Sequence, residues 1–80
     1  MRLLITGGAG FVGARLARTL LARGTLAGRP IGQVVLADQA APPPDLAAAP
    51  RIEARVGPLL EQCKALRVEP FDAVFHLASA

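Results

Sequence analysis

The sequence predicts an α/β fold built on a parallel sheet, and three observations support this prediction. Short apolar runs alternate with stretches of helical period, in the order β-α-β-loop-β-α-β. A glycine cluster stands between the first apolar run and the first helical stretch. An acidic residue, Asp38, ends the second apolar run. Strands that alternate with helices favour a parallel sheet with right-handed crossovers.

Length and composition narrow the class of protein. The 80 residues are enough for at most one small domain, and the single cysteine can form no internal disulfide, which fits a reducing compartment. The net charge of +3 is scattered and neither tryptophan nor tyrosine is present, so we expect no nucleic-acid partner. No apolar run is long enough for a signal peptide or a membrane span, so we expect a cytoplasmic protein without a membrane partner.

The first half of the chain is predicted to form two buried strands separated by a helix. Continuous apolar runs are typical of parallel strands that are covered on both faces. The helix has one apolar face, made by Val12, Leu16, Ala17, Leu20 and Leu21, while its arginines face solvent, and Gly24 is a natural stop. In order, we expect a strand over 3–6, a helix over 11–23, a loop over 25–33 and a strand over 34–37.

The second half is predicted as a loop, an edge strand, a helix and a last strand. Prolines interrupt residues 39–50, so this region is a loop with at most one helical turn, over 45–49. Residues 51–56 alternate between apolar and charged side chains, which is typical of a strand near an edge. A helix over 58–68, with Leu59, Leu60, Cys63 and Leu66 facing inward, precedes a strand over 72–77.

The glycine cluster "TGGAGFVG" fits two dinucleotide-binding templates. Gly8, Gly10 and Gly13 satisfy G-x-G-x-x-G, and Gly7, Gly10 and Gly13 satisfy G-x-x-G-x-x-G. In either template the first glycine allows a tight turn. Gly10 lets the backbone approach a pyrophosphate, and Gly13 lets the helix pack close to the sheet. The alternative is a flexible turn that binds no ligand.

The helix that follows the cluster is expected to hold the anion. The N–H groups of Phe11 and Val12 point at it, and the helix dipole adds about half a positive charge there. A P-loop is excluded, because Ala14 and Arg15 stand where lysine and serine or threonine are required.

Asp38 is the candidate that binds the adenosine ribose. It follows Gly13 by 25 positions instead of the usual 20 or so, and the long 25–33 loop accounts for the excess. Its carboxylate can accept hydrogen bonds from ribose hydroxyls but would repel a 2′-phosphate, and no arginine or lysine stands at 39–41. These observations favour NAD over NADP. The alternative role for Asp38 is a turn former at the strand end.

Two further residues are expected to be structural. His76 has no carboxylate placed to orient it, and Cys63 lies on the inward face of a helix. We therefore predict no catalytic residue and no metal ligand in these 80 residues.

The segments "LLITGGAGFVGARLARTLLARG", "VVLAD" and "FDAVFHLAS" resemble the extended short-chain dehydrogenase/reductase family, whose members include nucleotide-sugar epimerases and dehydratases. The stretch "LLARGTLAGRPIGQVVLAD" is similar to the branch that contains D-erythronate dehydrogenase. The resemblance implies a Rossmann-type doubly wound sheet with strand order 3-2-1-4, NAD as cofactor and a homodimer. It implies these cofactor-binding residues: Gly7, Gly10, Phe11, Val12, Gly13, Asp38, Gln39, Leu59, Leu77, Ala78 and Ser79.

Two departures from the family pattern limit what the resemblance implies. The family commonly places an aspartate that binds the adenine amino group where this chain has Pro58, so that contact is in doubt. The family's catalytic serine or threonine and Tyr-x-x-x-Lys pair have no counterpart here, since the chain has no tyrosine and its one lysine, Lys64, stands outside such a motif. We therefore expect residues 1–80 to be the N-terminal part of an NAD-binding domain.

The expected function is an NAD-dependent oxidoreductase that acts on a hydroxyl of a sugar acid or a nucleotide sugar, with this segment binding the cofactor. Two alternatives remain. One is a nucleotide-sugar epimerase or dehydratase, in which NAD is not consumed, and the other is a non-catalytic dinucleotide sensor.

Overall fold

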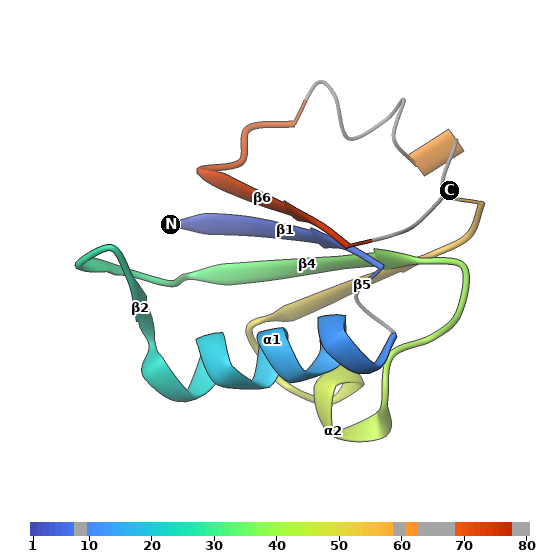
Figure 1. Cartoon of the computed structure of the whole chain (residues 1–80), viewed down its shortest axis with the longest axis horizontal. Coiled ribbons are helices and arrows are strands. Elements are labelled where there is room, and N and C mark those ends of the chain that lie inside the picture. The colour runs from blue at the N-terminus through green and yellow to red at the C-terminus, as the bar shows by residue number, and fades with distance from the viewer. Residues whose placement is uncertain (8–9, 59–60, 63–68, 78–80) are drawn as a thin grey trace.

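The computed structural model describes residues 1–7, 10–58, 61–62 and 69–77, in which four parallel strands form one sheet (Figure 1). The order across the sheet is β5-β4-β1-β6, so the first strand lies between the second and the last. This result confirms the α/β class and the expected order 3-2-1-4. The strands are β1 (Arg2–Thr6), β4 (Gln33–Asp38), β5 (Ile52–Val56) and β6 (Ala73–His76).

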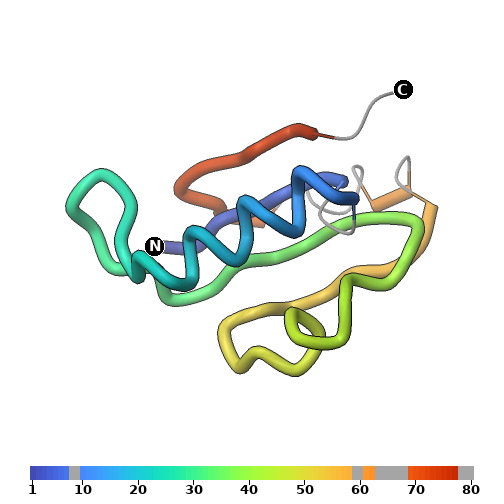
Figure 2. Tube along the Cα trace, turned by 60° about the horizontal axis from the view of Figure 1, so that its bottom comes forward, coloured from blue at the N-terminus to red at the C-terminus, as the bar shows by residue number. Residues whose placement is uncertain are grey.

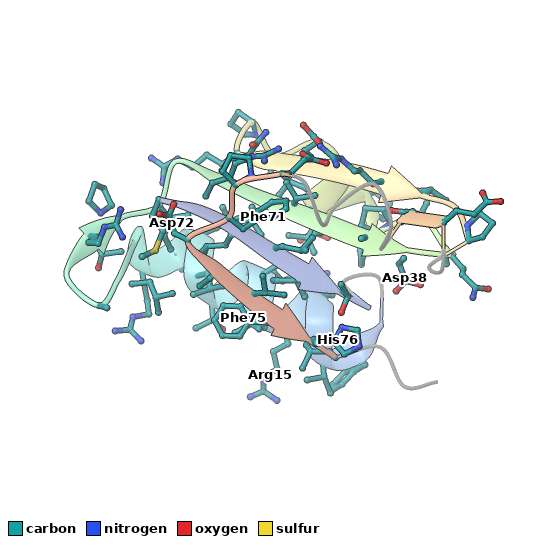
Figure 3. The ribbon with its side chains drawn as sticks, turned by 90° about the horizontal axis from the view of Figure 1, so that it is seen from above. Arg15, Asp38, Phe71, Asp72, Phe75 and His76 are labelled. Carbon is teal, nitrogen blue, oxygen red and sulfur yellow. The ribbon has the colours of Figure 1, made fainter. Side chains whose placement is uncertain are left out.

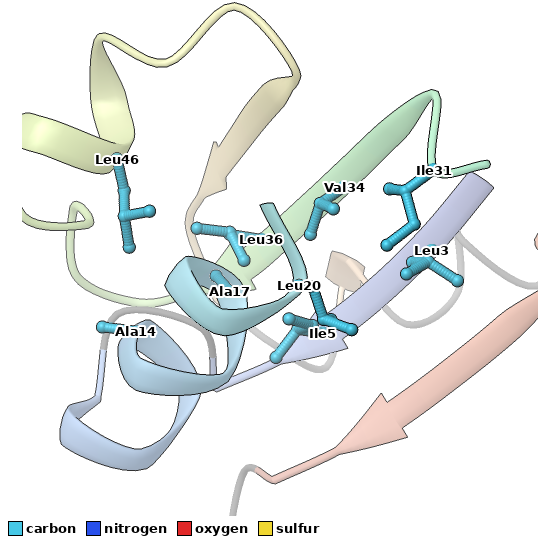
Figure 4. Close-up of a cluster of buried hydrophobic side chains, with 9 residues drawn as sticks. All are labelled: Leu3, Ile5, Ala14, Ala17, Leu20, Ile31, Val34, Leu36 and Leu46. Atoms are coloured by element: carbon cyan, nitrogen blue, oxygen red, sulfur yellow. The ribbon is translucent and has the colours of Figure 1, made fainter. Parts of the chain in front are cut away.

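Two helices lie on the same face of this sheet, α1 (Phe11–Arg23) and the single turn α2 (Pro44–Ala47) (Figures 1 and 2). The larger hydrophobic cluster fills the space between them and the strands (Figure 4). A smaller cluster on the opposite face contains Leu4, Val35 and Ala37, against which Phe71 packs. β1 and β4 are therefore covered on both faces, as their continuous apolar runs predict. The larger cluster consists of Leu3, Ile5, Ala14, Ala17, Leu20, Ile31, Val34, Leu36 and Leu46.

The buried face of α1 differs from the predicted one at its N-terminal end. Val12 is 63% exposed, whereas Ala14, which was not among the residues assigned to the apolar face, is buried. The buried residues of α1 are Gly13, Ala14, Ala17 and Leu20, and the first three are small enough to let the helix axis approach the strands. Leu16 and Leu21 pack at the margin of the same cluster, as expected. Gly24 ends the helix in the left-handed region at φ 72°, as predicted.

The segment predicted as a loop over 25–33 contains a small antiparallel hairpin. Its strands are β2 (Thr25–Leu26) and β3 (Arg29–Pro30). Ala27 and Gly28 connect them with φ of 52° and 78°, and two consecutive positive φ values fit the turn that suits a two-residue hairpin. The sequence did not indicate this turn, because alanine is seldom found in that conformation and Pro30 argues against a strand.

The region around α2 partly agrees with the predicted turn over 45–49. The helix begins one residue earlier, at Pro44, and ends at Ala47. Arg18, on the solvated face of α1, donates two hydrogen bonds to Asp45, at 2.8 and 2.9 Å. This exposed ion pair joins the two helices.

The last third of the chain is described in part. β5 lies at an edge of the sheet, as predicted, with Ile52 against the core and Ala54 and Val56 exposed. Of the predicted helix over 58–68, Glu61 and Gln62 are helical, and the N–H of Gln62 donates to the Pro58 carbonyl at 3.1 Å. Residues 59–60 and 63–68, which include Cys63, lie outside the described residues. None of the described helices is long and apolar enough to cross a membrane.

Ion pairs tie the second face of the sheet to the segment before β6. The Glu69 carboxylate accepts hydrogen bonds from Arg55, and it also pairs with Arg2 at 3.0 Å. The Arg2 guanidinium lies 4.6 Å from the centre of the Phe71 ring, and the Arg2 N–H donates to the Asp72 carboxylate at 2.6 Å. Glu69 therefore joins strands β1 and β5 to the chain that enters β6.

We expect Glu69→Gln to reduce the acid sensitivity of the fold. The hydrogen bonds from Arg55, with smaller ones from Arg2, lower the pKa of the Glu69 carboxyl from 4.5 to about 2. A carboxyl with a lowered pKa stabilises the folded state fully above its ordinary pKa, and that contribution is lost as the pH falls toward 2. Urea unfolding at a series of pH values measures the effect. The variant should lose less stability on acidification than the parent protein, and the exposed Glu61→Gln should behave like the parent.

Candidate functional site

The carboxyl ends of the four strands meet at one edge of the sheet. Figure 3 shows Asp38 and His76 at this edge and Asp72 at the opposite one. The hydrogen-bond ladder extends one residue past the ends of β1 and β6. The N–H of Gly7 donates to the Ala37 carbonyl at 2.7 Å, and the N–H of Leu77 donates to the Thr6 carbonyl at 3.0 Å. The chain therefore leaves β1, β4 and β6 at one level, and several loops can contact one ligand there.

The turn after β1 requires glycine at its first position. Gly7 has φ of 80°, a conformation that residues with a Cβ adopt at a cost. Its carbonyl accepts a hydrogen bond from Gly10 N–H at 3.2 Å, and a Cβ at Gly10 would stand 3.4 Å from the same oxygen. The first glycine of G-x-x-G-x-x-G is thus in a glycine conformation, while Gly8 lies outside the described residues.

The start of α1 is suited to an anion. Gly10 is the extended N-cap residue, and no side chain caps the helix or adds an acidic charge to its first turn. The first helical bond runs from Ala14 N–H to the Gly10 carbonyl at 2.8 Å, so the amides of Phe11, Val12 and Gly13 precede it. The side chains of Phe11 and Val12 are exposed, at 83% and 63%. This end of the helix carries the positive end of the dipole.

Asp38 ends β4 at the same edge and is half-buried. Its Oδ1 accepts hydrogen bonds from the backbone N–H groups of Gln39, at 2.6 Å, and Ala40, at 3.3 Å. The turn-forming role considered from the sequence is therefore real. These two hydrogen bonds fix the orientation of the carboxylate at the end of β4.

His76 makes a structural contact that the sequence did not specify. Its Nδ1 lies 2.6 Å from the hydroxyl oxygen of Thr6, a buried side chain. The two residues are opposite each other in the parallel register of β1 and β6. The hydrogen bond joins the strand ends beside the glycine turn. The pairing of Thr6 with His76 follows from the parallel register once β1 and β6 are assigned as neighbouring strands.

Gln62 is the other residue that the sequence did not indicate. Its Nε2 donates to the Gly57 carbonyl at 3.0 Å and to the Asp38 carbonyl at 3.4 Å. The amide therefore bridges the ends of β4 and β5. Of the remaining predicted residues, Leu77 is exposed just past β6, whereas Leu59, Ala78 and Ser79 lie outside the described residues.

Other features of the described chain do not form a competing site. A hollow of about 360 Å³ is lined by Leu21, Ala49, Pro50 and Arg51, and it contains none of the predicted residues. Among the described residues, no three His, Cys, Asp or Glu side chains gather closely enough to hold a metal ion.

A family model described as "NAD dependent epimerase/dehydratase family" matches residues 3–80. A solved structure of dTDP-glucose 4,6-dehydratase from Streptomyces venezuelae, with NAD and TYD bound, is 33% identical over the whole of this chain, with a TM-score of 0.78. A nucleoside-diphosphate-sugar epimerase from Agrobacterium tumefaciens is 30% identical, again over the whole chain, with a TM-score of 0.77. No curated protein matched the chain. This chain spans 27% and 24% of the lengths of these two proteins.

We expect Gly7→Ala to destabilise the protein by about 1–2 kcal/mol, because a Cβ is strained in the left-handed region. The matched control is Gly32→Ala, since the added Cβ would lie at an ordinary 3.7 Å from the Met1 carbonyl oxygen. Urea unfolding of both variants tests the assignment. Equal stability losses would show that the turn does not need glycine at its first position.

Proposed function

The chain belongs to the NAD-dependent epimerase/dehydratase family, and on this premise we propose that the carboxyl edge of its sheet binds NAD. We further propose that the protein acts on a hydroxyl of a sugar acid, such as D-erythronate, or of a nucleotide sugar. The observation that supports cofactor binding most directly is the glycine-bounded, uncapped start of α1 at the same edge of the sheet as Asp38.

The fit of the cofactor to this edge can be judged from the chain's own residues. The amides of Phe11, Val12 and Gly13 supply hydrogen-bond donors for a diphosphate, and Gly10 adds no side chain that would keep it away. Asp38 supplies acceptors for the adenosine ribose. Gln39 and Leu77 lie at the same edge and can line the cofactor. The residues present therefore suit a dinucleotide.

The chemistry that NAD supplies when it is bound is acceptance of a hydride. The described residues hold and orient the cofactor, and we propose that the groups that move protons come from sequence beyond these 80 residues. The outer edge of β6 supports this proposal. Val74 is 56% exposed, and no described strand pairs with that edge. An open parallel edge of this kind fits a sheet that continues in a longer protein. For that longer protein we also propose a homodimeric state and a cytoplasmic location.

Two candidate activities differ in what happens to the cofactor. A dehydrogenase consumes one NAD per product, whereas an epimerase or dehydratase removes a hydride and returns it. The similarity to the Agrobacterium epimerase and the Streptomyces dehydratase supports the second candidate. The sequence similarity to sugar-acid dehydrogenases supports the first. A non-catalytic sensor is a third candidate, and a downstream sequence without Tyr-x-x-x-Lys would favour it.

We expect measurement of NADH to separate the first two candidates. The longer protein is supplied with sugar acids or nucleotide sugars and stoichiometric NAD, and absorbance follows the reduced cofactor. NADH that accumulates in step with product identifies a dehydrogenase. Product formed with only catalytic NAD identifies an epimerase or dehydratase.

We expect Asp38→Ala to weaken NAD binding about 10–100-fold and NADP binding less, because hydrogen bonds to a charged acceptor are lost only with NAD. The same substitution also removes repulsion of the 2′-phosphate. Calorimetric titration with both cofactors measures the two Kd values. The matched control is Asp45→Ala, which removes a carboxylate from α2 that pairs with Arg18. An equal loss for NAD and NADP would overturn the assignment of Asp38.

A further inference from the structure

The side-chain amide of Gln62 occupies the junction between β4 and β5 at the carboxyl edge. Its Nε2 donates to the Gly57 and Asp38 carbonyls, and Gly57 N–H donates to the same Asp38 oxygen at 2.9 Å. The orientation of the amide is therefore fixed. Rotating it by half a turn would place Oε1 against two carbonyl oxygens, and none of the three could donate.

The other end of this amide lacks a partner. Gln62 Oε1 has less than 1 Å² of exposed surface and no hydrogen bond, and no other buried side-chain N or O atom in the described part of the chain is in this condition. A buried acceptor without a donor is costly, and native proteins contain few of them. The position of this one, next to the backbone of Asp38, points to a ligand that brings an N–H donor.

We propose that Gln62 recognises the adenine base of NAD, with Oε1 accepting a hydrogen bond from the exocyclic amino group. This inference rests on the proposed function. The base is attached directly to the ribose that Asp38 is proposed to hold, and Gln62 contacts the backbone of Asp38 itself. Of the polar atoms on the edge of adenine, the amino group is the hydrogen-bond donor. An unpaired acceptor at this place is thus complementary to adenine.

The neighbouring sequence gives a reason for this role. Gly57 is followed by Pro58, whose side chain can neither donate nor accept a hydrogen bond. Pro58 therefore offers the adenine base no polar side chain. Gln62, four residues later in the chain, supplies a polar side chain instead. Because Oε1 is shielded, the base reaches it only as the surrounding groups adjust. The hydrogen bond between the adenine amino group and Oε1 offsets part of the free energy that this rearrangement costs.

The experiment compares NAD with its purine analogue, in which a hydrogen atom replaces the exocyclic amino group of adenine. We expect the parent protein to bind NAD about tenfold more tightly, because the purine ring of the analogue brings no hydrogen-bond donor on this edge and leaves Oε1 unpaired. We expect Gln62→Met, of nearly the same shape, to bind the two cofactors within about twofold of each other. The adjacent, exposed Glu61→Gln is the control and should keep the tenfold preference.

The outcomes separate this inference from the proposed function. Equal binding of the two cofactors by the parent protein would overturn the role of Gln62 while NAD binding stands, and this measurement needs no variant. A Gln62→Met protein that loses affinity but keeps the tenfold preference would show that Gln62 only supports the fold. Failure of the parent protein to bind either cofactor would overturn the proposed function and this inference together.

Discussion

The hydrogen-bond ladder on both sides of β1 is the constraint on which the rest of this structure depends. β1 pairs with β4 on one side and with β6, some seventy residues later in the chain, on the other. The parallel register places Thr6, Ala37 and His76 in one row, and every loop that leaves this row starts at the same level. This register brings the glycine turn, Asp38 and Leu77 to the same edge of the sheet.

The sequence predicted those features that follow from strong local patterns. The apolar runs at 3–6 and 34–37 indicated strands covered on both faces, and Asp38 was located as the residue that ends one of them. Gly24 was predicted as the helix stop, and its φ of 72° agrees. In each case the local sequence is enough to assign the strand, the strand end or the helix stop, so packing against the rest of the protein does not change the assignment.

The features that the sequence did not predict depend on packing or on distant partners. Hydropathy placed Val12 on the buried face of α1, but close packing selects small residues, and glycine and alanine carry little hydropathic signal. The Ala27–Gly28 turn was missed because alanine accepts a positive φ there. Thr6 and Gln62 act through partners on other elements, which a single sequence does not reveal. The cofactor-binding roles of all the predicted residues remain predictions, and Leu59, Ala78 and Ser79 also lie outside the described residues.

The uncapped start of α1 has a consequence for how acidity acts on this protein. Backbone amides do not titrate within the range where proteins remain folded, so their attraction for a diphosphate depends on the geometry of the turn. A lysine or histidine at that position would tie affinity to protonation. The Glu69 carboxylate between Arg2 and Arg55, whose pKa is lowered to about 2, belongs instead to the scaffold. Acid strong enough to protonate Glu69 would therefore loosen the framework without altering the intrinsic preference of the glycine turn for its anion.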